Sequence, residues 1–574
     1  MSGCLRMTND KININNEKRE FLDGKSCCAY KLLGSVSRGG STEFRVWAPN
    51  ADRCFVSSGG KKIEMQRDGG FFHIKTSADF SKGYRYLIEK NGDIFEKNDP
   101  FAFSVNGERL SEVVSLDGIK PDIWRKNCGV MRIFEVHAGA GFDFLSKTLP
   151  SYIKKLGFTH AELMPVFSHP CVESWGYQAT GYFSFEYGSP QSFAALVRAF
   201  HEEGMGVIID LPLGHFANDF YGLGRFDGTP LFESADETVS QNRLWGTVNT
   251  DFGKPAARSL MLSSACFLAD VFGIDGIRVD AAANMIFDRF DGYGSFGGAD
   301  DINISALEFL RALTNEMRKR NVITIAEDSS AVISSTAPAA LGGLGFDRKQ
   351  NLGWYHDTSV YFSAPPYVRG TLGDYILKPF SYMNGENYLL PVSHDENSHG
   401  KGTLASRLKD EKNQKLMLFY MYASKGDKLL FDGCERGAVS EWNPGAEGRG
   451  ETPGIAGFVS KLNWVCDELA PLSGECGEPN FSEGVLTFSR FGTGEDDFVI
   501  AAVNTSDTDF EDFRIGVDRF TDFRTVISTD ESLEGLVYKP MAFSAGGHMF
   551  SVSVKLPALS GVLLKPDFIW KNKI

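Results

Sequence analysis

The sequence predicts an α/β fold in which a central (β/α)₈ barrel is flanked by an N-terminal and a C-terminal β-sandwich. Three observations support this prediction. Strand patterns dominate the early part of the chain, short apolar runs then alternate with segments of helical period over roughly 350 residues, and strand patterns return near the end. The 574 residues, 42% of them apolar, are enough for several packed domains.

A polar arm and a β-domain are expected first. Residues 1–20 are rich in Asn, Lys and Glu, and we expect residues 1–28 to form a flexible arm. We expect an N-terminal β-sandwich over residues 29–118, because polar and apolar residues alternate there between glycine-containing turns. The clearest strand patterns are Glu43–Trp47, Phe71–Ile74 and Tyr84–Ile88.

Residues 119–476 are predicted to form the barrel. The apolar runs of strand type are Met131–His137, His160–Val166, Gly206–Pro212, Gly276–Asp280, Ile323–Glu327, Tyr388–Asp395 and Lys428–Phe431, and the weakly patterned stretch Phe346–Trp354 is the candidate for the eighth. Apolar residues at helical spacing include Phe193, Leu196, Val197 and Phe200, and then Leu310, Leu313 and Met317. Eight strand-helix units favour a barrel over an open doubly wound sheet. No GxGxxG or GxxxxGK(S/T) motif follows a strand, which disfavours a nucleotide-binding protein.

A second β-sandwich is predicted for residues 477–574. A helical segment, Gly457–Leu472, precedes it. Strand patterns then return at Val485–Phe491, Phe498–Asn504 and Ser551–Leu556.

Charge and hydropathy exclude several classes of partner. A formal net charge of −15 argues against a nucleic-acid partner, because binding a phosphate backbone needs concentrated Lys and Arg. The start of the chain has no apolar stretch of signal-peptide type, and nowhere do about 18 apolar residues run together. We therefore expect a soluble cytoplasmic protein with no membrane partner. A monomer is expected as well, although no sequence pattern indicates the oligomeric state.

The ten cysteines are scattered along the chain without a paired metal-binding spacing: Cys4, Cys27, Cys28, Cys54, Cys128, Cys171, Cys266, Cys434, Cys466 and Cys476. We expect reduced thiols. Because the sequence also lacks HExxH and any Cys/His cluster, we expect neither a catalytic metal nor another cofactor.

Three predicted barrel strands end in an acid: Asp280, Glu327 and Asp395. In barrel enzymes the C-terminal ends of the strands form the active-site face, so these carboxylates should converge although they lie far apart in the sequence. Each of them alone has a structural alternative, which is to cap the next helix or to pair with a basic residue. The three together favour catalysis by carboxylates.

Arg278 precedes Asp280 by two residues and therefore shares its side of the strand. A guanidinium at that position can hold the Asp280 carboxylate ionised. Glu327 must instead start protonated to act as an acid, which partial burial near anions would favour. Environment could thus divide the two carboxyl groups into a nucleophile and an acid.

Side chains suited to a sugar ligand accompany the acids. Three histidines lie at or just beyond strand ends: His137, His215 and His394. Five aromatic residues are candidate platforms for sugar faces: Trp175, Tyr177, Trp245, Trp354 and Trp442. Any one of these aromatics is more often a core or loop residue. Three histidines beside acids favour hydrogen bonding to hydroxyl groups.

The segments RVDA, AEDS and SHDEN contain the three acids, and they resemble the conserved regions of the α-amylase superfamily. An ordered series of further segments is similar to the 1,4-α-glucan branching enzymes: Glu135–His137, Glu162–Pro165, Trp175–Gln178, Gly214–Phe216, Phe226–Thr229, Gly342–Phe346, Asn351–Trp354 and His399–Lys401. Phe21–Ser35 with Arg45–Pro49 resembles the glucan-binding-type β-module that precedes the barrel in that family. By this resemblance the module would help to hold long glucans through exposed aromatic residues.

The resemblance implies a role for each candidate residue. Asp280 would be the nucleophile, Glu327 the general acid/base and Asp395 the stabiliser of the transition state. The same sugar subsite would be lined or supported by Tyr177, which stacks on the ring, and by Asp210, His215, Arg278 and His394. Two carboxyl groups about 5–5.5 Å apart permit a covalent glycosyl-enzyme and transfer with retained configuration. The implied reaction is glycogen branching, with α-glucan as donor and acceptor.

Some segments depart from the family pattern. Asp432-Gly433-Cys434-Glu435 stands where the family usually has Met-Gly-Asn-Glu, and the stretch from Trp442-Asn443 to the next helix is shortened. Thr247–Phe252 and Thr229-Pro230 also differ from the common spelling. These loops shape the outer subsites, so the departures concern the transferred chain length and the acceptor preference.

Two other functions stay open. A hydrolase of the same superfamily, either debranching or trehalose-releasing, would share the three acids and the N-terminal module. Trp175–Gln178 together with His399–Lys401 favours branching by resemblance. A glucan-binding protein without catalysis is disfavoured, because the three acids are retained beside Arg278.

Overall fold

The computed structural model describes residues 13–124, 129–287, 301–331, 333–398, 400–443 and 451–567. Internal contacts group the chain into two compact units. The first unit holds residues 1–126, 136–150 and 161–347, and the second holds residues 127–135, 151–160 and 348–574.

Eight strands close into a parallel barrel, as the sequence predicts. In barrel order they are β10 (His160–Leu163), β13 (Gly206–Leu211), β17 (Gly276–Val279), β18 (Ile323–Ala326), β19 (Arg348–Gln350), β20 (Tyr388–Val392), β21 (Asp427–Phe431) and β9 (Arg132–Val136). The weakly patterned stretch Phe346–Trp354 does contain the eighth strand, β19. Every residue of β13 and β17 is buried, which explains why parallel strands appear in the sequence as largely apolar runs.

Helices separate the barrel strands along the chain. They are α3 (Phe142–Lys155), α4 (Pro190–Glu202), α6 (Pro255–Phe267), α8 (Ile304–Lys319), α9 (Leu352–Ser363), α10 (Gly373–Tyr382), α12 (Glu411–Ala423) and α13 (Ile455–Glu468), with the short α5 (Glu237–Ser240), α7 (Ala282–Ile286) and α11 (Leu404–Leu408). Helix α4 illustrates why these segments form helices. Ser189 caps it by accepting a hydrogen bond from the Ser192 N–H, Pro190 occupies its first turn, and the predicted apolar face from Phe193 to Phe200 is buried.

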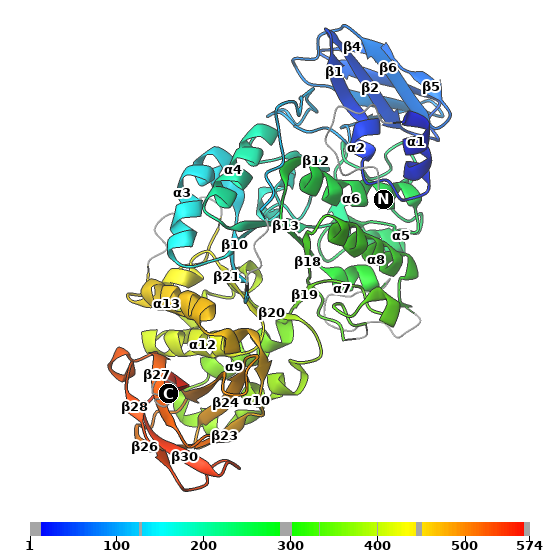
Figure 1. Cartoon of the computed structure of the whole chain (residues 1–574). Helices are drawn as coiled ribbons and strands as arrows, with labels where there is room; N and C mark the ends of the chain where they lie inside the picture. The colour runs from blue at the N-terminus through cyan, green and yellow to red at the C-terminus, as the bar shows by residue number, and fades with distance from the viewer. Residues whose placement is uncertain are drawn as a thin grey trace. The chain divides into compact units, whose positions relative to one another are not determined.

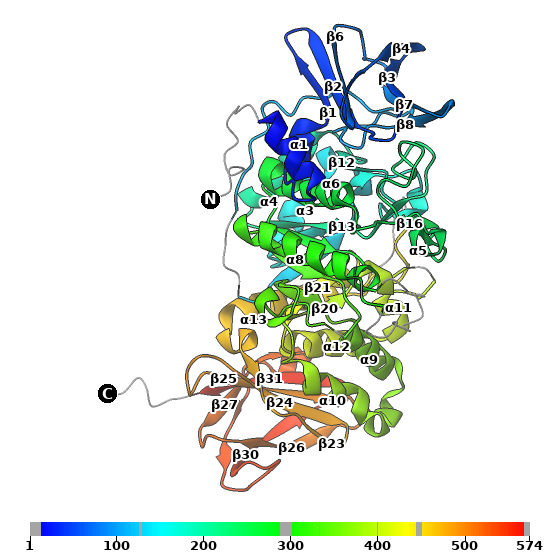
Figure 2. The same cartoon turned by 90° about the vertical axis from the view of Figure 1, so that its right-hand side faces the viewer.

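The N-terminal module of the first unit consists of two antiparallel sheets (Figure 2). One sheet has the order β1 (Gly34–Arg38), β2 (Ser41–Trp47), β6 (Phe71–Thr76) and β5 (Gln66–Asp68), and the other has the order β4 (Lys61–Glu64), β3 (Arg53–Ser58), β7 (Arg85–Lys90) and β8 (Asp93–Lys97). The ring of Phe44 in β2 lies 4.5 Å from Phe80 and 4.8 Å from Tyr84, measured between centroids. Aromatic burial between short strands thus supplies the core of the module.

The expectation of a flexible arm is wrong for residues 13–28. Asn13 caps helix α1 (Ile14–Leu22), which is followed by α2 (Ala29–Leu32), and both lie beside α6 (Figure 1). Phe21 is completely buried, and its ring lies 5.4 Å from that of Trp47. Ser26 accepts a hydrogen bond from the Ser263 hydroxyl of α6. One buried ring and a few buried hydroxyl contacts order this polar segment; residues 1–12 lie outside the described residues.

The second unit ends in the predicted C-terminal β-sandwich. One sheet contains β22 (Glu475–Cys476), β24 (Val485–Phe491), β25 (Phe498–Asn504), β31 (Ser560–Asp567), β27 (Asp522–Ser528) and β28 (Val537–Tyr538), with β23 (Asn480–Ser482) beside β24; the other contains β26 (Phe510–Val517), β30 (Phe550–Leu556) and β29 (Pro540–Met541). Apolar residues of both sheets, such as Ile500 and Val554, form one core. Buried Arg490 ties β24 to α12 by donating to the Ala423 carbonyl.

The cysteines of the described residues are free thiols, and Cys4 and Cys128 lie outside those residues. Within the described ranges we find no helix with the length and apolar character needed to cross a membrane.

Candidate active site

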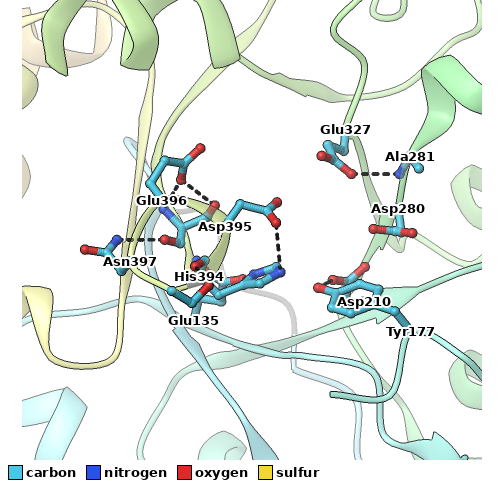
Figure 3. A network of polar contacts seen from close by, with 12 residues as sticks. Glu135, Tyr177, Asp210, Asp280, Ala281, Glu327, His394, Asp395, Glu396 and Asn397 are labelled. Atoms are coloured by element: carbon cyan, nitrogen blue, oxygen red, sulfur yellow. Dashed lines mark hydrogen bonds and ion pairs between the residues drawn. The ribbon is translucent and has the colours of Figure 1, made fainter. Parts of the chain in front are cut away.

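In the first unit, four candidate residues lie at the carboxyl ends of three adjacent strands, β13, β17 and β18. Asp210 of β13 is paired in register with Arg278 of β17, and Asp280 and Glu327 directly follow β17 and β18. The Asp280 N–H donates to the Leu211 carbonyl over 3.1 Å, and the Glu327 N–H donates to the Val279 carbonyl over 3.0 Å. The strand ladders therefore hold both carboxylate-bearing residues at the same level (Figure 3).

One buried guanidinium, that of Arg278, contacts three carboxylates. Its Nη1 lies 2.5 Å from Asp210 Oδ2 and 2.9 Å from Asp280 Oδ1, and its Nη2 lies 3.0 Å from Glu327 Oε2. Burial by itself would lower the pKa of Arg278, but the negative charges of Asp210, Glu327 and Asp280 outweigh burial and hold that pKa well above its ordinary value. The predicted contact of Arg278 with Asp280 is confirmed.

Glu327 is also held by the turn that follows Asp280. The Ala281 N–H donates to Glu327 Oε2 over 2.7 Å (Figure 3). The Ala282 N–H donates to the Glu327 carbonyl over 2.8 Å. Ala281 has φ 47°, a left-handed conformation that is unfavourable for a residue with a Cβ. The Asp280 and Glu327 side chains are 12% and 17% exposed, so both remain open to a ligand.

Tyr177 reaches the same cluster from the loop before β12 (Gly181–Phe185), which pairs with β11 (Phe167–Ser168). Its hydroxyl donates to Asp210 Oδ2 over 2.5 Å. Gly176 makes the approach possible, because its φ is 97° and a Cβ there would lie 2.4 Å from the Pro165 carbonyl oxygen. Asp210 is fully buried, and it therefore links Tyr177 to Arg278 rather than facing a ligand.

His215 begins β14 (His215–Ala217), which forms a small sheet with β16 (Thr247–Asn249) and β15 (Gln241–Asn242). The His215 ring lies 5.0 Å from the ring of Trp245, measured between centroids. Burial lowers the pKa of His215 to about 4, although a hydrogen bond with the Tyr177 backbone opposes this shift. The imidazole is therefore neutral at pH 7 and can share a hydrogen bond with a hydroxyl group.

In the second unit, His394 and Asp395 lie in a short 3₁₀ turn, His394–Glu396, directly after β20. Glu396 closes the turn as a capping box, because its Oε2 accepts from the Ser393 N–H over 2.9 Å and from the Ser393 hydroxyl over 2.6 Å. Burial, followed by the charge of Asp395, raises the pKa of Glu396 to about 7. The turn leaves the Asp395 side chain 43% exposed.

Glu135 of β9 fixes the orientation of His394. Its Oε1 lies 2.5 Å from His394 Nδ1, and its Oε2 accepts from the His394 N–H over 2.9 Å. His394 Nε2 is left facing Asp395 Oδ1 at 3.6 Å. Glu135 is not among the site residues expected from the sequence, and its one sequence signal, an acid inside a buried strand, does not indicate this partner.

The remaining sequence candidates divide between core and loop positions. His137 Nδ1 accepts from the Gly139 N–H over 3.0 Å, so this histidine supports its own turn. Trp354 is completely buried and stacks on Tyr420 at 6.0 Å, which makes it a core residue and not a sugar platform. Trp175 is also buried, whereas Tyr177, Trp245 and Trp442 are only partly covered.

Lys401 and the Asp432–Glu435 segment have local structural roles. Lys401 Nζ donates to the Asp395 carbonyl over 2.6 Å, while His399 lies outside the described residues. In the divergent Asp432–Glu435 segment, Glu435 is buried and accepts from the Gly433 N–H over 2.6 Å and from the Tyr152 hydroxyl over 2.8 Å. Glu435 thus anchors the loop after β21.

A closed parallel barrel with an acidic cluster at its strand ends, combined with β-domains before and after it, defines an enzyme of the α-amylase class. Three family models match the chain. Residues 146–225 match the alpha amylase catalytic domain, residues 32–102 match carbohydrate-binding module 48 (isoamylase N-terminal domain), and residues 480–567 match the alpha amylase C-terminal all-beta domain.

Relatives that match this chain over nearly its whole length show which family it belongs to. The 1,4-alpha-glucan branching enzyme GlgB of Aquifex aeolicus (strain VF5) is 33% identical over 95% of this chain and 98% of its own length. The 1,4-alpha-glucan branching enzyme GlgB 1 of Clostridium perfringens (strain 13 / Type A) is 30% identical over 96% of this chain and 92% of its own length. The chain belongs to the family of 1,4-α-glucan branching enzymes.

Solved structures with a similar fold include two pullulanases. The enzyme of Anoxybacillus sp. LM18-11 in complex with maltotetraose has a TM-score of 0.71 and 16% identity, covering 93% of this chain and 87% of that one. The enzyme of Paenibacillus barengoltzii in complex with maltohexaose and alpha-cyclodextrin also has a TM-score of 0.71 and 16% identity, covering 97% and 98%. At this level of identity the likeness concerns the fold alone.

Proposed function

We propose that this chain forms α-1,6 branches in α-glucans by retaining transglycosylation. The observation that carries the proposal is the pair of carboxylates, Asp280 and Glu327, held at adjacent strand ends by the single guanidinium of Arg278. Membership of the branching-enzyme family supports α-glucan as both donor and acceptor. The match of residues 32–102 to a carbohydrate-binding module supports the same substrate class.

In the first half-reaction the Asp280 carboxylate attacks the anomeric carbon of an α-1,4-linked glucose, while Glu327 gives its proton to the departing 4-oxygen. The bond from C1 to O4 breaks, a β-linked glycosyl-enzyme forms on Asp280, and the shortened glucan leaves with a free 4-hydroxyl. Glu327 then removes the proton from a 6-hydroxyl of the acceptor, whose oxygen displaces Asp280 and forms the α-1,6 bond. Two inversions at C1 give net retention.

Arg278 sets the relative position of the two reacting carboxyl groups. It is planar, buried and bound to both, so it restricts the rotation of each side chain. The Ala281 N–H restrains the same oxygen of Glu327 that Arg278 contacts, and Asp210 in turn holds Arg278. Such preorganisation lowers the entropy loss of reaching the transition state.

We assign sugar binding to the other candidates. Tyr177 would stack on the sugar ring, and neutral His215 would share a hydrogen bond with a hydroxyl. Asp395, with its exposed carboxylate, would grip sugar hydroxyls and stabilise the positive charge that develops at C1, and His394 would assist it through Nε2. Transfer to a 6-hydroxyl instead of water requires an acceptor chain that is better oriented than the solvent.

The deciding experiment counts reducing ends. Purified chain is incubated with amylose, reducing ends are measured directly, and they are measured again after a debranching enzyme has cut the 1,6-linkages. We expect new ends only after debranching, because transfer conserves their number. Ends that rise directly would instead identify a hydrolase, and no change in either measurement would count against action on α-1,4-glucan.

Our first prediction is that Asp280→Ala and Glu327→Gln each reduce branching by at least about 10²–10⁴-fold while the melting temperature stays close to that of the wild type. Each variant removes one chemical role and little packing. The matched controls are Asp374→Ala, at an exposed position in α10, and Glu308→Gln, whose side chain is 58% exposed in α8. Both controls should branch at the wild-type rate; substantial activity in Asp280→Ala would contradict the assignment.

A covalent trap tests the two roles separately. With a maltosyl fluoride donor, the departing fluoride needs no proton, so Glu327→Gln should complete the first half-reaction and stall before the second. Intact-mass measurement should then detect one added maltosyl group, and peptide mapping should locate it on Asp280. A label on another residue, or inversion of the anomeric centre in the product, would contradict the retaining mechanism.

A further inference from the structure

The loop that follows β14 is bound to the N-terminal module of the first unit. We call residues 218–233 the β14 loop; it begins directly after the strand that carries His215. The loop also returns to this strand, because the Asp251 N–H donates to the Phe232 carbonyl over 2.8 Å and β16 pairs with β14 at His215 and Asn249. A displacement of the loop would therefore shift His215 through β14, where the loop begins, and through β16, which pairs with β14.

Lys97, the last residue of β8, makes the central contact. It is 4% exposed, and its Nζ donates to the Phe220 carbonyl over 2.8 Å and to the Gly224 carbonyl over 2.7 Å. Burial lowers the pKa of Lys97 to about 8, opposed by the charges of Asp219 and Glu233 in the loop, so an ammonium group prevails at pH 7. A buried ammonium is costly unless its partners stay in place, and it therefore selects one loop conformation.

Other residues of the module bind the same loop. The Asn98 N–H donates to the Tyr221 carbonyl over 2.9 Å, and the Arg85 guanidinium lies 3.5 Å from the centroid of the Tyr221 ring. Further along, the Asn50 N–H donates to Asp227 Oδ2 over 2.9 Å, and Asp227 is fully buried. The module thus holds the β14 loop at two separate points.

A third contact allows almost no clearance. At Gly228, φ is 81° and a Cβ would lie 2.6 Å from the ring of Phe95, a residue of β8. Only glycine permits this approach of the loop to the sheet. The contact lies beside the Asn50 anchor, because the Asn50 side chain donates to Thr229 Oγ1 over 3.1 Å.

We propose that the N-terminal module acts on the chemical step by fixing the β14 loop, with Lys97 as a positioning residue for His215. This proposal rests on the proposed function, because it gives His215 a place in the sugar subsite. The module then contributes to turnover even with a donor too short to extend onto it. Glucan binding by the module alone would leave the reaction of such a donor unchanged.

The test compares Lys97→Met with Lys75→Met, a matched change at an exposed lysine of β6. The first readout is limited trypsin digestion, followed by mass spectrometry at Arg225, an exposed residue of the loop. We expect Lys97→Met to be cut at Arg225 about tenfold faster, because local opening exposes the bond. Lys75→Met should be cut at the wild-type rate.

The second readout is fluoride release from maltosyl fluoride. We expect Lys97→Met to lower kcat by about 10–100-fold, as a misplaced subsite residue would, with a much smaller change in KM. Unchanged kcat on this short donor, combined with weaker action on amylose, would overturn the proposal and favour glucan binding by the module. Equal cutting at Arg225 in Lys97→Met and the wild type would also overturn it.

A second, milder variant keeps the proposal testable if Lys97→Met fails to fold. Asn50→Ala changes an exposed side chain and removes the hydrogen bond that it donates to Thr229 Oγ1. This variant should increase cutting at Arg225 and reduce fluoride release, both to a smaller extent than Lys97→Met. If Asn50→Ala matches the wild type in both readouts, the result would count against the proposal. A wild-type chain that forms no branches and releases no fluoride would contradict the proposed function, whereas digestion at Arg225 would still decide whether Lys97 holds the loop.

Discussion

Arg278 contacts both Asp280 and Glu327, but only the first contact follows from the sequence. Its contact with Asp280 follows from spacing, because residues two apart share one side of a strand. Its contact with Glu327 depends on the register of two strands, in which Val279 is opposite Ala326, so that the next residues on each strand are also level. Alignment of parallel strands therefore brings together two acids that are separated by the whole of α8.

Glu135 illustrates a residue whose role could not be predicted. It lies in β9 and its partner His394 follows β20, and these two strands are both neighbours of β21. The pair meets across an intervening strand. No periodicity in either segment points to the other, and the signal that was present, a carboxyl group in a buried strand, has many structural explanations.

Glu135→Gln tests this role. The Glu135 carboxylate contacts the backbone N–H and the ring Nδ1 of His394, whereas an amide offers one acceptor and one donor, so the ring should lose its fixed orientation. We expect about a 10²-fold loss of kcat, the effect of a misplaced catalytic-site group, with little change in melting temperature. Steady-state branching kinetics check this. Wild-type kcat in the variant would mean that Glu135 has no influence on turnover.

At the scale of elements, helix α1 is the clearest difference between the sequence prediction and the structure. Its segment is polar, and its buried positions include Glu17 and Phe21, which give no visible apolar stripe. Residues of α6 and of the N-terminal module complete its contacts, as the rings around Phe21 show. A short helix of this kind is stabilised by tertiary packing and not by its own propensity, so its own residues did not reveal it.

Phe21→Ala and Leu22→Ala give a matched test of that correction, because Phe21 is completely buried and Leu22 is 47% exposed. Phe21→Ala should lower the free energy of unfolding by about 3–5 kcal/mol through lost burial and a cavity. Leu22→Ala should change it by less than about 1 kcal/mol. Urea denaturation followed by circular dichroism measures both values. Equal small effects would restore the interpretation of residues 13–28 as a loose arm.

Stability of the whole molecule should depend on pH through buried histidines. Burial, followed by the charges of Arg132 and Arg348, lowers the pKa of His160 in β10 to about 3. The unfolded chain therefore binds one more proton than the folded chain between pH 6.5 and 3, and the stabilisation present above pH 6.5 is lost as the pH falls through this window. At pH 4.5 the expected loss from this one group is about 2–3 kcal/mol.

The measurement compares His160→Asn with the wild type by chemical denaturation at pH 7, 6, 5 and 4.5. The variant should be less stable at pH 7, and the difference should shrink as the pH falls, because only the wild type carries the titrating group. His356→Asn is the control for the same change of side chain at an exposed position, since the His356 side chain is 74% exposed. A constant difference for His160→Asn would contradict neutral burial of this histidine.

The sequence by itself determined the strand and helix pattern of the barrel, the β-domains on either side of it, and the acids at Asp280, Glu327 and Asp395. These features leave local signals, since buried parallel strands are continuous apolar runs and an acid at the end of such a run stands out. The tertiary structure decided which distant groups position the acids and the other site residues. The Ala281 N–H on Glu327, Glu135 on His394 and the anchoring of the β14 loop by Lys97 all join segments that pack together only after folding, and burial of these polar groups makes each contact specific.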